Sequence, residues 1–478
     1  MTPVRRTVLL ALGSLAALAA PSCFDSGVRW QETPAPAPPP PVCVVGASRC
    51  DFGRFERCED PGKGAAWSVK DDCTSQGLVC NTQLQKCTEC IGGQAACLAQ
   101  EVIACNDDGT RGAVLETCDT TKGTACRAGN CTNLCVLAKT QRSNVGCEYW
   151  AVDLDNAMIA VTSNAAAQQF AVVVSNAQPD VATDVHIFQD DGQPGDVSAP
   201  VEIQGATIAA LNLQVFKLGP REVDGSPDGE YNTGSHTALT RHAYKITSNY
   251  PVVAYQFNPL ENANVFSNDA SLLKPREALT PSTMGLLPAY VVVSWPQTIA
   301  ATDDPNTNFN PFAPINLRAF LTIVGTAEST KIRVHTTTGV VGGGPIPATP
   351  PFGVIDATLG PFDVLNLETG DFNADFTGSV IDADGPIAVF TGGEAADAPH
   401  FTTLADRRCC ADHLEDQLDP LRTAGKKFAI AHTPSRTRAV KQAGAQTGIV
   451  PEPDYVRFVA ASNNGALIKT TLPKPDDE

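Results

Sequence analysis

One short stretch concentrates the residue types that do chemistry. Residues 407–420 read Arg-Arg-Cys-Cys-Ala-Asp-His-Leu-Glu-Asp-Gln-Leu-Asp-Pro, and the last two thirds of the chain contain no other cysteine. The acidic composition predicts a short helix, on which Cys409, His413 and Asp416 stand at i, i+4 and i+7 on one face. Such a set could hold zinc together with one further ligand.

The alternative for this stretch is a structural corner locked by disulfides. Cys409 and Cys410 could pair with Cys135 and Cys147, which fall outside the cysteine repeats described below, or with each other in a strained ring. His413 would then be hydrogen-bonded. Adjacent cysteines rarely share a metal in an exported protein, so we predict a disulfide corner with no metal and no catalytic residue.

Catalytic signatures are missing elsewhere in the sequence. It contains no G-x-S-x-G elbow, no H-E-x-x-H, no P-loop and no Rossmann glycine fingerprint. Acidic turns at residues 153–156, 190–192, 303–304 and 382–384 could bind calcium, but Asp, Asn and Gly also form turns without any ligand. We therefore predict that the protein is not an enzyme and uses no cofactor.

The N-terminus is typical of an export signal. Arg5 and Arg6 precede an apolar run from Val8 to Ala20, and small residues lead to Cys23, as in a bacterial lipobox. The alternative is an ordinary secretory signal with a spare thiol. Without Cys23, 16 of the 17 cysteines remain, an even number that suits disulfides in an oxidising compartment. We expect a signal peptide over 1–22 and lipidation at Cys23.

Residues 23–42 are expected to be a linker between that anchor and the folded protein. Their proline-rich part, Glu32–Pro41, favours an extended polyproline conformation that spans about 30 Å. Such a spacer would hold a domain away from the membrane. The predicted location is the outer membrane or cell surface, or the medium if the protein is secreted.

A cysteine-rich module follows over residues 43–135. Residues 43–87 and 90–131 each contain six cysteines, and the first three of each set are offset by 47 residues, which indicates an internal repeat. Because so small a repeat buries little hydrophobic core, disulfides must hold it. Zinc bound by the cysteines is the alternative, but no histidine that could serve as a further zinc ligand precedes His186. The predicted disulfide cysteines are Cys43, Cys50, Cys58, Cys73, Cys80, Cys87, Cys90, Cys97, Cys105, Cys118, Cys126, Cys131, Cys135, Cys147, Cys409 and Cys410.

The region from residue 148 onward predicts an all-β fold. Strand, turn and strand are expected at 170–188, and the same pattern returns at 320–335 and at 456–471. Residues 244–256 and 379–391 both predict a strand, a tight turn with proline and a second strand. We predict two tandem β-sandwich-like units of about 140 residues within 148–455. The start of a third, truncated unit is expected at 456–478, unless its hairpin completes an earlier sheet.

Residues 410–430 also carry a motif that resembles the N-terminal domain family of IgGFc-binding protein. The motif is Cys-x-x-His-x-x-Asp-Gln-Leu-x-Pro with a later glycine, and its residues are Cys410, His413, Asp416, Gln417, Leu418, Pro420 and Gly425. Similar family elements are Pro386–Gly392 and Pro251–Gln256, so the resemblance covers roughly 148–478. It implies an extracellular β-rich binding or adhesion module without catalysis.

The composition limits the possible partners. The formal net charge of −18 repels nucleic acid and anionic membrane surfaces, so contact with a membrane is expected only through the lipid anchor. The predicted function is surface-anchored binding or adhesion to an unknown extracellular protein or polysaccharide. A structural component of the envelope or matrix is the alternative, and a hydrolase with an unrecognised site is a third.

Overall fold

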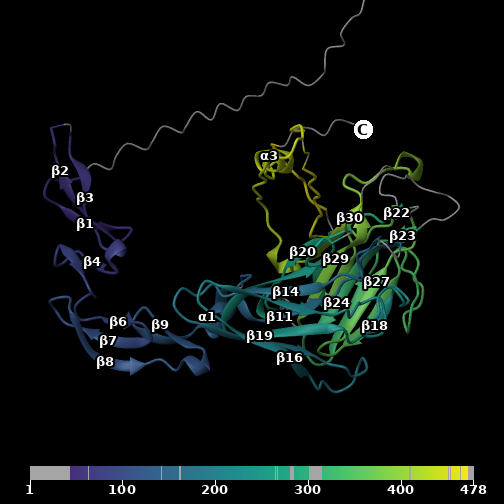
Figure 1. Cartoon of the computed structure of the whole chain (residues 1–478), viewed down its shortest axis with the longest axis horizontal. Helices are drawn as coiled ribbons and strands as arrows, with labels where there is room; N and C mark the ends of the chain where they lie inside the picture. Colours follow the sequence, from purple (N-terminus) through teal and green to yellow (C-terminus); the bar gives the residue numbers. More distant parts are fainter. Residues whose placement is uncertain are drawn as a thin grey trace, which may run out of the picture. The chain divides into compact units, whose positions relative to one another are not determined.

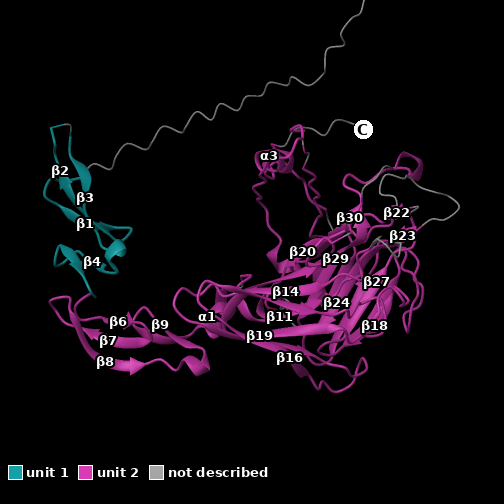
Figure 2. Ribbon diagram, in the orientation of Figure 1, with its two compact units in different colours: residues 1–89 teal, residues 90–478 magenta. Residues whose placement is uncertain are grey.

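The computed structural model describes residues 43–471 except 63, 142, 161–162, 264, 266, 280–284, 301–314, 408–410, 451, 453 and 463–464 (Figure 1). The expected signal peptide, linker and Cys23 therefore lie outside the described residues, as do Cys409 and Cys410. The chain divides into two compact parts, residues 1–89 and residues 90–478 (Figure 2).

The first cysteine repeat is a small β structure held by disulfides. Its strands are β1 (Ser48–Asp51), β2 (Arg54–Glu59), β3 (Ala66–Asp72), β4 (Val79–Asn81) and β5 (Lys86–Thr88). β1, β2 and β3 form an antiparallel sheet, and β4 pairs with β5. Three disulfides join Cys43 to Cys58, Cys50 to Cys80 and Cys73 to Cys87.

The second cysteine repeat has the same organisation. Its strands are β6 (Ala95–Leu98), β7 (Glu101–Cys105), β8 (Arg111–Thr117), β9 (Thr124–Arg127) and β10 (Asn130–Asn133). Its disulfides join Cys90 to Cys105, Cys97 to Cys126 and Cys118 to Cys131. In both repeats the first cysteine pairs with the third, the second with the fifth and the fourth with the sixth, so the duplication extends to the connectivity.

A seventh disulfide connects the second repeat to the β region. Cys135 on α1 (Leu134–Gln141) pairs with Cys147 on β11 (Gly146–Val152). Of the two alternatives considered for Cys409 and Cys410, the one that paired them with Cys135 and Cys147 is therefore wrong. The Tyr250 hydroxyl donates a hydrogen bond to the carbonyl of Thr124 at 2.9 Å, which adds a second attachment of the repeat to the β region.

The first sandwich is built around one long strand. β19 (Ala243–Asn258) pairs through its first half with β11 and β15, and through its second half with β14 and β20. The strands thus form two ladders, β16-β15-β19-β11 and β17-β14-β19-β20, which β19 joins into one seven-stranded sheet. The other bounds are β14 (Phe170–Ser175), β15 (Thr183–Gln189), β16 (Val201–Ile208), β17 (Leu213–Leu218) and β20 (Asp269–Leu272).

The second sandwich repeats this topology, which confirms the predicted tandem units. Its sheets are β26-β25-β28-β21 and β18-β27-β24-β29-β30, where β28 and β29 replace the two halves of β19. The bounds are β18 (Ala238–Thr240), β21 (Leu287–Val291), β24 (Ala319–Gly325), β25 (Thr330–His335), β26 (Val354–Leu359), β27 (Val364–Glu368), β28 (Val380–Ala383), β29 (Ile387–Ala396) and β30 (Asp412–Gln417).

Short elements complete the described part of the chain. β12 (Met158–Ala160) pairs with β13 (Ser163–Asn164), and β22 (Thr298–Ala300) pairs with β23 (Ile315–Leu317). The other α-helices of the described residues are α2 (Arg276–Leu279) and α3 (Arg436–Gln442), and short 3-10 helices occur as well. Among the described residues, no helix has the length and apolar composition needed to cross a membrane.

The predicted hairpins are wrong in their pairing. Residues 244–256 form part of one continuous strand, and β14 and β15 each pair with β19 instead of with each other. The strands β24 and β25 belong to different sheets, as do β28 and β29. In the second sandwich the turns after β24 and β28 carry the chain into another sheet, whereas residues 249–251 lie within the continuous strand β19. Asn, Asp, Gly and Pro favour a change of direction in either case, so they do not distinguish the two connections.

The expected start of a third unit is also wrong. Residues 454–462 and 465–471 contain no strand, although their apolar and β-branched composition favours one. Residues 456–471 therefore neither begin a new sandwich nor extend an existing sheet within the described chain. A strand needs a partner ladder, and propensity alone does not provide one.

The core is shared between the two sandwiches. β24, β27 and β29 are buried along nearly their whole length. Phe320 and Val324 of β24 belong to a hydrophobic cluster with the first sandwich, whereas Leu321 and Ile323 belong to a cluster within the second. Because both faces of this sheet are covered, its strands read as continuous apolar runs instead of alternating ones.

We expect Phe390→Ala to destabilise both sandwiches together. Phe390 is fully buried in the shared cluster, and removal of a buried phenylalanine side chain costs about 3–5 kcal/mol. Denaturant unfolding should show one cooperative transition over the β region with a lower midpoint. The control is Phe352→Ala, because Phe352 is 83% exposed. Two transitions, of which only one shifts, would contradict a shared core.

Candidate functional site

The motif around His413 is a strand and not the predicted helix. Residues 412–417 form β30, which pairs with β29 (Figure 1). Its side chains alternate between exposed and buried. His413 and Asp416 therefore point to opposite faces, so the predicted helix is wrong and the zinc alternative that depended on it is lost. The alternation was hidden in the sequence because the buried side chains are polar: His413, Glu415 and Gln417.

His413 and Glu415 form a buried pair between the sandwiches. The His413 Nε2 atom lies 3.5 Å from Glu415 Oε2, and His413 Nδ1 lies 3.3 Å from the carbonyl oxygen of Glu394. Gln256 of the first sandwich donates to Glu415 Oε2 at 3.2 Å. Burial lowers the pKa of His413, but the carboxylates of Glu415 and Asp269 outweigh burial and raise that pKa above its ordinary value.

The other motif residues hold β30 against the first sandwich and then turn the chain. The backbone N–H groups of Glu415 and Gln417 donate to Asp269 and Ser271 of β20 at 3.0 and 2.8 Å. After the strand come Leu418, which is buried in the cluster of the second sandwich, and then Pro420 and Gly425. The motif is therefore a structural connection, and its end leads directly into a cleft.

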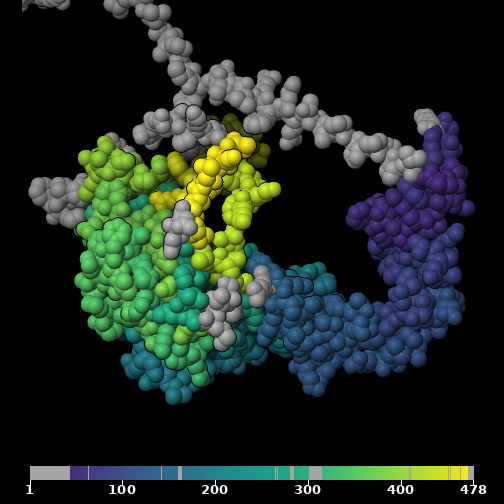
Figure 3. Space-filling view, turned by 180° about the vertical axis from the view of Figure 1, so that it is seen from behind, coloured from purple at the N-terminus to yellow at the C-terminus, as the bar shows by residue number. Residues whose placement is uncertain are grey.

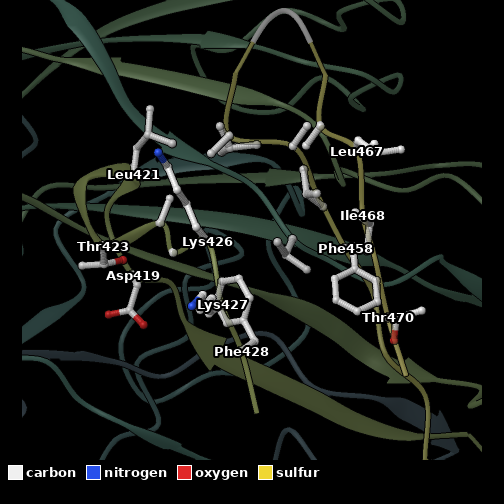
Figure 4. Close-up of a pocket in the computed structure, with 18 of the residues that line it drawn as sticks. Asp419, Leu421, Thr423, Lys426, Lys427, Phe428, Phe458, Leu467, Ile468 and Thr470 are labelled. Atoms are coloured by element: carbon white, nitrogen blue, oxygen red, sulfur yellow. The ribbon is translucent and has the colours of Figure 1, made fainter. Parts of the chain in front are cut away.

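This cleft has a volume of about 1090 Å³ and lies between two segments of the chain, the first of which includes a short 3-10 helix at Leu421–Thr423. Residues 419–430 form one wall, residues 458–461 and 466–471 form the opposite wall, and Val291 and Val293 contribute beside them. Figure 4 shows Leu421, Lys426 and Phe428 on one wall facing Phe458 and Ile468 on the other. Two of the motif residues, Pro420 and Gly425, line it.

The walls of the cleft are apolar and exposed. Leu467 is 88% exposed and Phe428 is 71% exposed, and Ile430, Phe458 and Ile468 are also among the exposed large hydrophobic residues. Neither wall contains a strand in the part of the chain that the structure describes, so their main-chain groups are not used in a β ladder. In the space-filling view the yellow C-terminal segment projects from the green surface, with an opening beside it (Figure 3).

Fixed contacts anchor the segment that carries the second wall. The Arg457 guanidinium lies 4.3 Å from the centre of the Trp295 ring and donates to Asp375 Oδ2 at 2.7 Å. Glu452 accepts hydrogen bonds from Ser435 and Thr437 at the start of α3. The two walls thus belong to one continuous segment of the chain that contains α3 between them. Glu452 holds this segment at α3, and Arg457 holds it at the start of the second wall.

A second constellation lies buried between the sandwiches, and sequence reasoning missed it. Asp155, His236, Glu368 and Glu394 bring ligand-type atoms within 4.8 Å of one another. Only Asp155 belongs to one of the acidic turns noted in the sequence. The sequence held one sign of these residues, because Glu368 at the end of β27 and Glu394 in β29 are each the one acidic residue of a mostly apolar strand.

The electrostatics of this constellation are unusual. Burial and the carboxylate of Asp155 raise the pKa values of Glu368 and Glu394 well above the ordinary value for glutamate. Burial likewise raises the pKa of Glu222, and raises that of Asp153 to about 7. Several carboxyl groups therefore share a dry environment in which simultaneous ionisation is unfavourable.

We expect Glu415→Ala to cost about 3–5 kcal/mol of unfolding free energy, because it leaves the buried His413 without its partner. The matched control is Glu202→Ala. Glu202 pairs with His186 at 2.7 Å, but both side chains are more than 40% exposed, so the cost should be about 0–1 kcal/mol. Denaturant titration measures both values, and equal losses in the two variants would refute the structural role of the pair.

Comparison with known proteins agrees with the motif. Residues 269–477 match the family described as IgGFc binding protein, and this segment runs from β20 through the second sandwich and the cleft. The match begins later than the resemblance seen in the sequence, which started near residue 148. Neither the curated proteins nor the solved structures give a match. Over residues 269–477 this chain is thus similar to the IgGFc binding protein family.

Proposed function

We propose that this chain is an exported, surface-anchored and non-catalytic binding protein that holds an extracellular protein in the cleft between residues 419–430 and 458–471. The observation that carries the proposal is that both walls of the cleft expose apolar side chains and that neither wall is paired in a sheet of the described chain. The family match supports binding as the general activity.

The chemistry of the cleft fits an extended polypeptide. Neither wall belongs to a β ladder of the described chain, so a partner strand could pair with the main chain of either one, which is the basis of strand addition. Exposed Phe428, Phe458 and Ile468 would receive alternate side chains of that strand. A polysaccharide would use neither the main-chain groups nor these apolar side chains as fully, so a protein partner is the better fit.

The local charge of the cleft differs from that of the whole chain. Lys426, Lys427 and Lys469 line it beside one acid, Asp419, whereas the net charge of the chain is −18. An approaching partner therefore meets a cationic patch on an acidic protein. We expect the bound segment to combine apolar residues with Asp or Glu.

The remainder of the chain supports delivery to the outside of the cell. Seven disulfides hold residues 43–147 and suit an oxidising compartment. The export signal and Cys23 provide the proposed anchor, and the proline-rich linker with the cysteine-rich module provides a stalk. Self-association through the cleft would instead favour a structural role in the envelope or matrix.

We expect Leu467→Asp to weaken binding by about 10-fold to 100-fold, because the burial of one leucine side chain stabilises a complex by about 1.5–3 kcal/mol. The purified full chain would be offered to a phage library of extended peptides, to antibody Fc and to matrix polysaccharide. Dissociation constants are then measured by interferometry for each binder.

The matched control for that substitution is Val197→Asp, because Val197 is 93% exposed and does not line the cleft. It should leave every dissociation constant unchanged. Binding of polysaccharide alone, or equal binding by both variants, would refute the cleft as a protein site. Concentration-dependent self-assembly of the wild type, lost in Leu467→Asp, would assign the cleft to copies of this chain instead.

Lipidation is tested separately from binding. We expect radiolabelled palmitate to enter the protein in a bacterial host and to be lost in Cys23→Ala, since that thiol would carry the lipid. Cell fractionation should move the variant from the membrane to the soluble fraction. If the Cys23→Ala chain stays in the membrane fraction without taking up label, the proposal that Cys23 carries the membrane anchor is refuted.

A further inference from the structure

We infer that Asp155, His236, Glu368 and Glu394 form a binding site for one divalent transition-metal ion, Zn²⁺ or Mn²⁺, which ties the two sandwiches together. The inference concerns the buried constellation and does not depend on the proposed cleft.

The four residues converge from different parts of the fold. Asp155 follows β11 of the first sandwich, and His236 precedes β18, while Glu368 ends β27 and Glu394 lies in β29. The His236 Nδ1 atom lies 3.5 Å from Glu368 Oε2 and 3.9 Å from Asp155 Oδ2. Ligands that bind one zinc or manganese ion at about 2.0–2.2 Å lie about 3.0–4.4 Å apart, so only small movements are needed.

The atoms that face the constellation are buried and lack partners. Both carboxylate oxygens of Asp155, Oε2 of Glu368, Oε1 of Glu394 and Nδ1 of His236 have no hydrogen-bond partner among the described residues. The side chains of Asp155 and Glu368 are fully buried. The Arg318 guanidinium lies 3.8 Å from Glu368 Oε2, so one positive charge stands near three buried carboxyl groups. A buried carboxylate without enough compensating charge costs several kcal/mol, and a bound cation reduces that cost for all three acids.

The surrounding contacts orient the ligands toward one point. Asn366 donates to Oε1 of Glu368 at 2.7 Å and to the carbonyl of His236 at 2.9 Å, so the second oxygen of Glu368 is left for the site. Ser267 and the motif residue His413 both contact the carbonyl oxygen of Glu394, at 3.1 and 3.3 Å. The contact of Asn366 with the Glu368 side chain is typical of a metal ligand, whereas Ser267 and the motif residue His413 hold the backbone of the strand that carries Glu394.

The ligand types select the class of ion. Three carboxylates offer hard oxygens, which many divalent ions accept, but an imidazole nitrogen favours zinc, manganese or iron over calcium and magnesium. His236 has φ +67°, a conformation that histidine adopts more readily than most residues, and its side chain is 40% exposed. It is therefore the ligand on the solvent side, where an ion can enter.

The experiment measures metal content and its effect on folding in the full chain. The protein is stripped with chelator, reloaded with ZnCl₂, MnCl₂ or CaCl₂, desalted and analysed by elemental mass spectrometry and thermal unfolding. We expect about one zinc or manganese ion per chain and a higher melting temperature after reloading. Mn²⁺ bound at the site should also give an altered electron paramagnetic resonance spectrum.

Matched variants assign the ligands. Glu394→Gln and His236→Ala should each weaken metal affinity at least about tenfold and remove the stabilisation by metal. The control is Asp363→Asn, a buried carboxylate that is paired with Arg241 at 3.3 Å outside this constellation, and it should still take up one ion.

Three outcomes would overturn the site. One is no metal uptake together with an unchanged melting temperature, and another is uptake of calcium alone that is insensitive to His236→Ala. The third is a Glu394→Gln variant that is more stable than the wild type and binds metal equally well, because the carboxyl groups would then be held by shared protons. If the cleft fails to bind any partner while metal is retained, only the proposed function falls.

Discussion

The structure depends on one sheet that is buried on both faces. β24, β27 and β29 of the second sandwich cover the first sandwich with one face and the core of their own sandwich with the other. Trp150 of β11 contacts Phe362 edge to face at 4.9 Å, so the aromatic core itself bridges the two sandwiches. A tandem duplication has in this way become a single packed body, in which neither half buries its surface alone.

Burial on both faces forces the polar residues between the sandwiches into dry surroundings. Asp155, Glu368 and Glu394 sit where the two halves meet, and so do the pair of His413 and Glu415. Polar groups in such positions need partners, because the free energy lost by burying an unpaired charge exceeds the stabilisation gained from a few side-chain contacts. The buried carboxylates and the family motif are therefore consequences of the same interface, connected through the backbone of Glu394.

The cleft shows the opposite situation. Residues 419–430 and 456–471 leave the packed body, carry exposed apolar side chains and form no sheet of their own in the described chain. Segments that have β propensity without a ladder are suited to acquire one from a partner. The rigid sandwiches position the cleft, because the motif strand β30 ends where the first wall begins and Arg457 fixes the second.

The sequence by itself determined four features: the duplication of the cysteine repeat, the all-β class, the tandem units and the family motif at His413. Each depends on local spacing or on repetition along the chain, which a sequence displays directly. Only the tertiary structure decided which cysteines pair, which strands share a sheet, that the motif is a strand with polar residues inside, and that Asp155, His236, Glu368 and Glu394 meet. These are contacts between residues far apart in the chain, and a turn or a single acid looks the same in the sequence whichever neighbour it finally meets.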